Sequence, residues 1–339
     1  MEQAIHEASP TRTDRTMKAM VRDRYGGPEV LRLDDVPIPR PRADEVLVRV
    51  RAASVNAADW HLLRAKPFLV RLMVGGLFRP RYAGLGLDVA GEVEAVGPNV
   101  DGFHPGDVVY GDLAEHGFGA FAEYVCAPEH AFAPKPPQLT FAEAAAVPVA
   151  GVTALQGLRD EGQIQAGDAV LVNGASGGVG TFAVQIAQAL GATVTGVCRR
   201  GKRGLVHSLG AARVIDYTKE DVTKRDELYD LILDTAAHRS PLAYRRILAP
   251  GGVYVMVGGS TVRLLQTMLL RPWVGRTSGH RLTTLMANPN SEDLRVLSDF
   301  LAEGAVTPVL DRHFSLAEVP DAIRYLEGGR ARGKVVITM

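Results

Sequence analysis

Cysteine is scarce in this chain, because only Cys126 and Cys198 occur among its 339 residues. Two thiols cannot build a disulfide framework or supply a structural zinc site made of four cysteines. Low cysteine content without a disulfide pattern is typical of a reducing compartment, so a cytoplasmic location is expected.

An excess of charge of either sign is also missing, since 38 Lys and Arg residues stand against 38 Asp and Glu residues. A neutral chain has no overall attraction to nucleic acid or to an anionic membrane. No basic stripe stands out along the sequence either, so no nucleic-acid partner is expected.

Long apolar runs and a targeting segment are absent as well. Residues 139–158 carry little charge but contain Glu143 and Pro148, which favours buried helices at a domain junction over a membrane span. Residues 262–270 include Arg263 and are too short to span a bilayer. Residues 1–16 are polar, lack an apolar core and are predicted to be a disordered extension, with Met17 as an alternative start.

The sequence divides into two regions that differ in their secondary-structure patterns. From residue 17 to about 138, short strand patterns are broken by Pro and Gly, which indicates a β-rich body. From about residue 141, strand and helix patterns alternate, as in a parallel, doubly wound α/β sheet. Strands are predicted at 169–175, 193–198, 213–217, 229–236, 252–259 and 281–287, with helices that include 205–210 and 243–251.

The stretch 170–200 carries the clearest motif. An apolar β-branched run, Val170 to Val172, leads into a cluster of small residues, and a helical pattern follows from Thr181 to Leu190. The cluster reads Ala-x-Gly-x-x-Gly from Ala175 to Gly180, so it lacks the first glycine of the full dinucleotide fingerprint. Small residues at this turn let a pyrophosphate approach the helix N-terminus, although a tight turn without a ligand would use them too.

The end of the next predicted strand, at 193–197, points to one particular cofactor. Sites for NAD usually place Asp or Glu here for the ribose 2′-hydroxyl. This chain instead has Cys198, Arg199 and Arg200, followed by Lys202 and Arg203. Cations at this position favour the 2′-phosphate of NADPH, the alternative being a solvated basic helix start.

Several short segments together make the chain from Met17 to Met339 resemble a known family. They read YGGPEVL at 25–31, VNAADWHL at 55–62, GLDVAGEVEAVG at 86–97, GAFAEYVCAP at 119–128, AAAVPVAGVTAL at 144–155, NGASGGVG at 173–180 and GKVVI at 333–337. They resemble the medium-chain dehydrogenase/reductases, most closely the zinc-free quinone oxidoreductase (zeta-crystallin-like) branch.

This resemblance implies a fold and an assembly. The fold is a Rossmann doubly wound parallel sheet inserted into a GroES-like β-rich domain, with the active cleft at the junction. The domains are expected at 17–140 plus 289–339 for the GroES-like substrate domain, and at 141–288 for the Rossmann NADPH-binding domain. Members of the family are usually homodimers or homotetramers joined through an edge strand, here residues 281–287, and a homodimer is expected.

The resemblance also bears on metal. Zinc-dependent members bind catalytic zinc through Cys, His and Cys, and the matching positions here are Asn56, Leu87 and Val149. Leu and Val have no lone pair to donate, and an amide oxygen is a poor zinc ligand, so no metal is expected. The hydroxyl that begins the proton relay in zinc alcohol dehydrogenases is replaced by Ala58.

Matching the family residue by residue gives a candidate site. Asn56 is expected near the nicotinamide, where its amide would donate to a substrate carbonyl; the alternative is an Asn that closes a turn. His61 would donate to the developing enolate, or would be a packing histidine beside Trp60. Lys334 would reach the cofactor, or be a solvated lysine at a strand start. The residues expected to contact NADPH are Asn56, Thr153, Ala175, Ser176, Gly177, Gly178, Val179, Cys198, Arg199, Arg200, Tyr217, Val257, Gly258 and Lys334.

These features predict an NADPH-dependent reductase of a hydrophobic quinone or an α,β-unsaturated carbonyl compound. Without a Lewis acid, nothing lowers the pKa of a simple alcohol, whereas reduction of an activated double bond needs only hydrogen-bond donors and a proton. Two alternatives stay open: an ene-reductase dedicated to one biosynthetic pathway, and an NADPH-binding protein of low turnover with a structural or interaction role.

Overall fold

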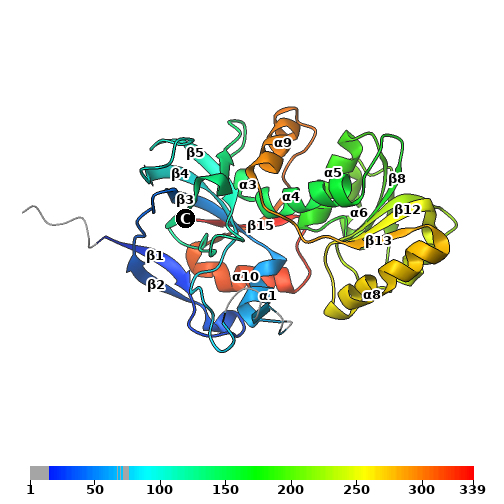
Figure 1. Ribbon diagram of the computed structural model, residues 1–339, viewed down its shortest axis with the longest axis horizontal. Coiled ribbons are helices and arrows are strands. Elements are labelled where there is room, and N and C mark those ends of the chain that lie inside the picture. The colour runs from blue at the N-terminus through cyan, green and yellow to red at the C-terminus, as the bar shows by residue number, and fades with distance from the viewer. Residues whose placement is uncertain (1–14, 67, 69, 72–75) are drawn as a thin grey trace, which may run out of the picture.

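The computed structural model describes residues 15–66, 68, 70, 71 and 76–339. Two large sheets lie side by side, one toward each end of the long axis, and helices run between and around them (Figure 1). The predicted extension falls mostly on residues 1–14, outside the described residues, but Thr16 already belongs to the first strand, β1 (Thr16–Val21). The prediction of a disordered extension is therefore wrong at Thr16.

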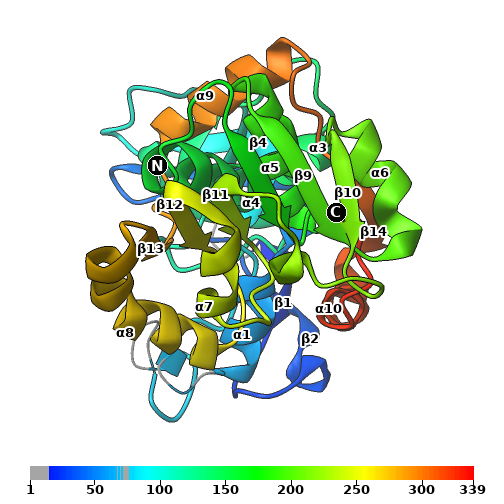
Figure 2. The same cartoon turned by 90° about the vertical axis from the view of Figure 1, so that its right-hand side faces the viewer.

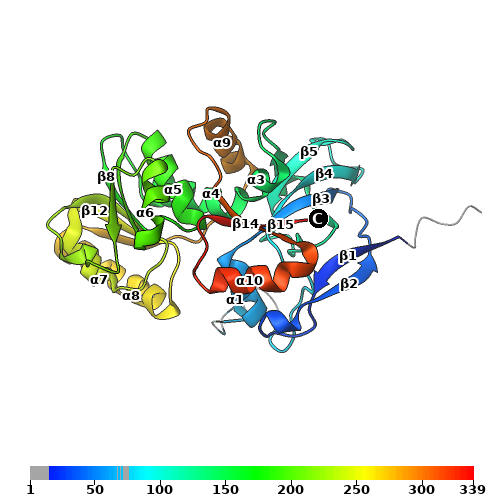
Figure 3. The same ribbon diagram turned by 180° about the vertical axis from the view of Figure 1, so that it is seen from behind.

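The first sheet is built from both ends of the chain. Its order is β14-β15-β3-β4-β5-β7, and β6 pairs with β3 as a seventh strand. In the view from behind, β15 is the late segment that runs next to β3 (Figure 3), and the two strands pair antiparallel. The strands are β3 (Glu45–Val55), β4 (Asp88–Val96), β5 (Val108–Asp112), β6 (Tyr124–Pro128), β7 (Phe132–Pro134), β14 (Leu310–Ser315) and β15 (Lys334–Thr338), while β1 pairs with β2 (Arg32–Pro37) in a separate ribbon.

The second sheet is parallel throughout and has the order β10-β9-β8-β11-β12-β13. The order reverses at β8, and in such sheets ligands bind at the carboxyl ends of the strands near the reversal. Helices cover both faces of this parallel sheet (Figure 2). The strands are β8 (Ala169–Asn173), β9 (Thr193–Cys198), β10 (Arg213–Asp216), β11 (Tyr229–Asp234), β12 (Leu248–Met256) and β13 (Arg281–Thr284).

The helices follow the sequence patterns with one clear difference. Residues 243–251 were predicted to be helical, but the helix ends at Tyr244, a 3-10 turn follows, and β12 begins at Leu248. Pairing of Leu248 with Tyr229 of β11 stabilises this extended backbone, which local propensity does not report. The helices are α1 (Ala57–Arg64), α3 (Phe141–Ala145), α4 (Pro148–Gln156), α5 (Gly178–Ala189), α6 (Arg203–Ser208), α7 (Pro241–Tyr244), α8 (Thr261–Ser278), α9 (Ser291–Ala302) and α10 (Val319–Glu327).

The turn between β8 and α5 shows why small residues stand there. A Cβ built on Gly180 would lie 2.2 Å from the carbonyl oxygen of Gly174, so only glycine lets helix and turn pack this closely. Gly174 has φ +83°, a region that favours glycine. The same turn meets the end of the chain, because the N–H of Gly333 donates to the carbonyl of Ser176 at 3.0 Å. The parallel second sheet and the β-rich body are thus joined at the carboxyl end of β8.

Within the part of the chain that the structure describes, no helix combines the length and apolar character needed to cross a bilayer.

Candidate active site

A cleft of about 1460 Å³ opens where the two sheets meet. One wall is the turn after β8, the second is the end of β9, and the third is the segment that leads into β15. Among the residues predicted to contact the cofactor, those that line this cleft are Ser176, Gly177, Gly178, Cys198, Arg199 and Tyr217.

The first wall fits a pyrophosphate. The N–H groups in the first turn of α5 have no carbonyl one turn earlier in the helix, so they are directed outward at the helix N-terminus. Gly177 and Gly178 have no side chains that would cover these N–H groups. A Cβ added to Gly178 would lie 3.0 Å from the Lys334 side chain, so the turn and Lys334 are close neighbours. Ala175 is fully buried beneath the turn, so its part is packing.

The charges that line the cleft are mainly positive. Three acidic side chains, Glu220, Asp311 and Asp321, face an excess of cations. Such a balance favours a ligand that carries several phosphate charges. The cationic residues are Arg199, Lys202, Arg239, Arg312, Arg324, Arg330 and Arg332.

The two adjacent arginines after β9 occupy different places. Arg199 lines the cleft and its Nε donates to the Tyr217 hydroxyl at 3.3 Å. Arg200 is exposed and is not among the described residues that line the cleft, so its predicted contact with the cofactor has no support. Lys202 does line it, and its Nζ donates to the carbonyl of Ala331 at 2.5 Å. Burial lowers the pKa of Lys202.

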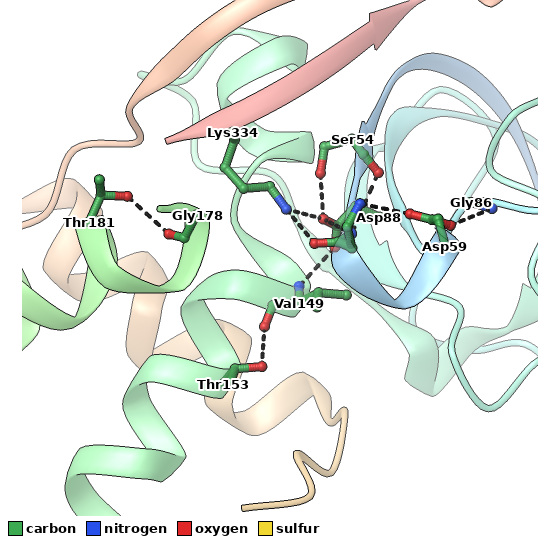
Figure 4. Close-up of polar contacts among 10 residues, drawn as sticks. Ser54, Asp59, Gly86, Asp88, Val149, Thr153, Gly178, Thr181 and Lys334 are labelled. Atoms are coloured by element: carbon green, nitrogen blue, oxygen red, sulfur yellow. Dashed lines mark hydrogen bonds and ion pairs between the residues drawn. The ribbon is translucent and has the colours of Figure 1, made fainter. Parts of the chain in front are cut away.

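Beside the cleft lies a buried polar group that we call the Lys334 cluster: Ser54, Asn56, Asp88 and Lys334. Figure 4 labels Ser54, Asp88 and Lys334. The Lys334 ammonium donates to Asn56 Oδ1 at 2.6 Å and to Asp88 Oδ2 at 2.9 Å. Asp88 Oδ2 also accepts from Ser54 Oγ at 2.5 Å and from Asn56 Nδ2 at 2.8 Å. Lys334 is only 2% exposed, so the alternative of a solvated lysine is wrong.

The orientation of the Asn56 amide follows from its partners. A lysine ammonium can only donate, so the amide oxygen must face Lys334, and the amide nitrogen then faces the carboxylate of Asp88. Both ends of the amide are bonded within the protein. The predicted donation from Asn56 to a substrate carbonyl is therefore revised: the geometry supports a positioning role for Asn56.

The positions where related enzymes bind zinc surround the same cluster. The N–H of Val149 donates to Asp88 Oδ1 at 2.8 Å, and Leu87 packs in the core one residue before Asp88. Neither side chain can donate a lone pair to a metal. In the described ranges, His, Cys, Asp and Glu side chains form no group of three that could hold a metal ion.

Two further buried carboxyls flank the cluster. Asp59 accepts the N–H groups of Asn56 at 2.7 Å and Gly86 at 3.1 Å, and so fixes the start of α1. Asp112 lies opposite Asp88 in the β4–β5 pairing. Burial, together with the nearby charge of Asp88, raises the pKa of Asp59 to about 7 and the pKa of Asp112 to about 8.

Other predicted residues have structural partners. The His61 ring stacks on Trp60 with centroids 3.6 Å apart, and its Nδ1 lies 2.7 Å from the carbonyl of Lys66, which favours the packing alternative. The Thr153 hydroxyl donates to the carbonyl of Val149 within α4 at 2.5 Å. Val257 and Gly258 follow β12, and both of their N–H groups donate to the carbonyl of Asp234. Val179 is the second residue of α5. Burial raises the pKa of Cys198 to about 11, so the Cys198 thiol stays neutral.

Sequence reasoning missed the third wall of the cleft. Arg330 and Arg332 stand four and two residues before Lys334, and Arg312 and Arg330 lie over the Tyr325 ring at 4.4 Å and 5.9 Å. The sequence did offer a signal for this wall. Arg330 and Arg332 stand just before the GKVVI motif, whose Lys334 was already expected to reach the cofactor, so these arginines could have been predicted to lie near the cofactor as well.

Fold and cleft together define a dinucleotide-binding oxidoreductase of two parts. Comparisons with known proteins agree. Residues 42–137 match the family described as alcohol dehydrogenase GroES-like domain, and residues 209–337 match zinc-binding dehydrogenase. The chain is 37% identical over 336 residues to 2-methylene-furan-3-one reductase of Solanum lycopersicum, with 95% of this chain and 79% of that protein covered.

Two further matches also cover nearly the whole of this chain. The NADPH-dependent alkenal/one oxidoreductase of Arabidopsis thaliana is 32% identical, with 98% of this chain and 82% of that protein covered. The solved quinone oxidoreductase from Coxiella burnetii is 31% identical, with a TM-score of 0.84 over 96% of this chain and 100% of that one. The chain belongs to the medium-chain dehydrogenase/reductase superfamily, among its quinone oxidoreductase-like members. The predicted family and fold class are confirmed.

The buried ion pair yields a stability prediction. Lys334→Met leaves Asp88 as an uncompensated buried charge and should lower the free energy of unfolding by about 3–5 kcal/mol. The double variant Asp88→Asn/Lys334→Met, which removes both charges, should recover part of that loss. Urea unfolding of the three proteins measures it, and a loss under about 1 kcal/mol in Lys334→Met would contradict the ion-pair account.

The raised carboxyl pKa values yield a pH prediction. Between the unfolded pKa near 4 and the folded pKa of about 8, folded Asp112 keeps a proton that the unfolded chain releases, so stability falls as pH rises. Asp112→Asn removes this linkage and should make the fall shallower by up to about 1.4 kcal/mol per pH unit. Thermal or urea unfolding from about pH 5 to about pH 8 tests it. Parallel curves for the two proteins would show that Asp112 ionises normally.

Proposed function

We propose that the protein is a zinc-independent, NADPH-dependent reductase of α,β-unsaturated carbonyl compounds and quinones. One observation carries the proposal: the zinc-ligand positions have become Asn56, Leu87 and Val149, grouped around a buried Lys334–Asp88 pair next to the dinucleotide turn. The names of the relatives, which include reductases of alkenals and furanones, support the same substrate class.

The residues of the chain would hold the cofactor along the cleft. The N–H groups at the start of α5 would bind the pyrophosphate, and Arg199 with Tyr217 and Lys202 would bind the adenosine side. The nicotinamide end would lie toward Lys334 and Asn56. A bound dihydronicotinamide supplies a hydride to the electron-poor carbon of the substrate.

The Lys334 cluster supplies the electrostatics. When hydride adds to the β-carbon of an enone, the electron pair of the double bond moves toward the carbonyl oxygen, which becomes negative. Lys334 provides a buried ammonium beside this site, held in place by Asn56 and Asp88. Because Asp88 balances its charge, the ammonium would act on the oxygen as a preorganised N–H donor, and such a donor acts more strongly where little water surrounds it. The α-carbon then takes a proton from solvent.

A homodimer is part of the proposal. β13 pairs with β12 on one side and lies at the end of the sheet order, so its other edge can pair with a second copy.

A reducing, cytoplasmic setting fits the free thiols of Cys126 and Cys198.

Cofactor preference is tested by the two adjacent arginines. Arg199→Ala should raise the KM for NADPH about ten- to a hundredfold, because a charge-assisted contact contributes about 1.5–3 kcal/mol, and should leave the KM for NADH nearly unchanged. Arg200→Ala is the matched control and should change neither value much. Equal effects of the two variants, or equal effects on both cofactors, would exclude a 2′-phosphate contact at Arg199.

The reaction is tested with NADPH deuterated at C4 and an enone as substrate. Deuterium should appear at the β-carbon of the product, and a chelator should leave the rate unchanged. Turnover of primary alcohols with NADP⁺ as fast as the best enone or quinone is reduced would overturn the proposal. Tight NADPH binding without turnover across a panel of enones and quinones would favour the structural or interaction role.

A further inference from the structure

The strand order of the parallel sheet indicates which half of a dinucleotide lies over which strands. On one side of β8 lie β9 and β10, at whose ends stand Arg199 and Tyr217, and on the other side lie β11 and β12 (Figure 2). The proposed cofactor places its adenosine side at Arg199 and its pyrophosphate at the turn after β8. Its nicotinamide half therefore extends toward the carboxyl ends of β11 and β12.

A buried carboxylate stands at this end of the sheet. Asp234 is the last residue of β11 and is fully buried. Its Oδ1 accepts from Asn173 Nδ2 at 2.7 Å and from the N–H of Ala236 at 3.2 Å, and its Oδ2 accepts from the Tyr254 hydroxyl at 2.8 Å. Asn173 and Ala236 both line the cleft, so the carboxylate lies directly behind the wall of the cleft.

Among the described residues, no lysine or arginine forms an ion pair with this carboxylate. Asp88 differs, because it is buried as well but pairs with the ammonium of the Lys334 cluster. The titratable groups near Asp234 are Tyr244, Tyr254 and the exposed His238. Burial raises the pKa of Asp234, and the hydrogen bonds that it accepts oppose that rise. Since buried charges are usually paired, an unpaired carboxylate beside a ligand cleft indicates a function.

The proposed reaction creates a positive charge on the same side of the cleft. When a hydride with its two electrons leaves C4 of the dihydronicotinamide for the β-carbon of an enone, the ring becomes a cation. The ammonium of the Lys334 cluster suits the negative charge on the substrate oxygen, not the positive charge on the ring. Its partner Asp88 is already neutralised by it.

We propose that Asp234 stabilises the positive charge that develops on the nicotinamide, and that it thereby makes bound NADPH a stronger hydride donor. This inference rests on the proposed function. A fixed carboxylate acts more strongly where little water surrounds it, and it needs no rearrangement when the opposite charge appears. Asp234 acts from behind Asn173 and Ala236, without contact with the ring.

The substitution Asp234→Asn separates the charge from the hydrogen bonds. The oxygen of the new amide can accept from Asn173 and Ala236 as before, and the amide nitrogen can donate to the hydroxyl oxygen of Tyr254. One negative charge is removed, while the wall of the cleft keeps its shape.

The experiment measures the dissociation constants of NADP⁺ and NADPH in mildly alkaline buffer, which favours the ionised carboxylate. Both forms carry the same phosphates, so the ratio of the two constants isolates the charge on the ring. In Asp234→Asn the ratio of the NADP⁺ constant to the NADPH constant should rise about tenfold. This is the order of magnitude for one charge that acts over about 10 Å inside a protein.

Asp230→Asn is the matched control. Asp230 lies in the same strand, four residues before Asp234, and its Oδ2 accepts from the N–H of Ala169 of β8 at 2.9 Å. It is roughly 13 Å farther from the carboxyl end of the strand, so the ratio should stay close to that of the parent protein. Tyr254→Phe, which removes one donor that favours the ionised carboxylate, should raise the ratio by a smaller factor than Asp234→Asn.

Thermal unfolding shows whether each variant is folded. The inference is overturned if Asp234→Asn leaves the ratio unchanged, or if Asp230→Asn raises it equally. Should Asp234→Asn not fold, an unchanged ratio in Tyr254→Phe overturns it.

The role of Asp234 and the proposed reaction fail separately, because the ratio is measured without substrate. Reduction of enones by a protein whose ratio does not respond would refute only the role of Asp234. The expected shift in a protein that reduces no enone or quinone would refute only the reaction. A protein that binds neither form of the cofactor would overturn both.

Discussion

The ion pair between Lys334 and Asp88 is the contact on which the geometry of the candidate site depends. Lys334 begins the last strand of the β-rich body, and its side chain lies against Gly178 of the dinucleotide turn. Asp88 accepts from Lys334, Ser54, Asn56 and the N–H of Val149, so one carboxylate joins three strands and α4. Buried charges are tolerated only when they are paired and fully hydrogen-bonded, which fixes the geometry of these partners.

In the proposed reaction, the same pair would take the place of a catalytic metal ion. A metal ion supplies positive charge beside the substrate oxygen. Here the proposed substitute is an N–H donor, the ammonium of Lys334, which Asn56 and Asp88 hold in one orientation. Such a donor can stabilise an enolate but cannot lower the pKa of an alcohol as strongly as a metal does, which favours conjugated substrates.

Sequence patterns predicted most of the fold and half of the cleft. β9 was predicted at 193–198 from the alternation of strand and helix patterns, and the turn at 175–180 from small residues that cluster between a strand and a helix. The polar contacts were beyond reach. Lys334 and Asn56 are 278 residues apart, so no local pattern reports that they bond. Arg199 and Arg200 look equivalent in the sequence, but only Arg199 lines the cleft.

The central claim is that cofactor and substrate meet beside the Lys334 cluster, and a crystal structure with NADPH tests it most directly. The account predicts pyrophosphate on the N–H groups at the start of α5, the 2′-phosphate beside Arg199, and the nicotinamide next to Asn56 and Lys334. A nicotinamide that lies away from Lys334, or a metal ion bound in its place, would contradict the account.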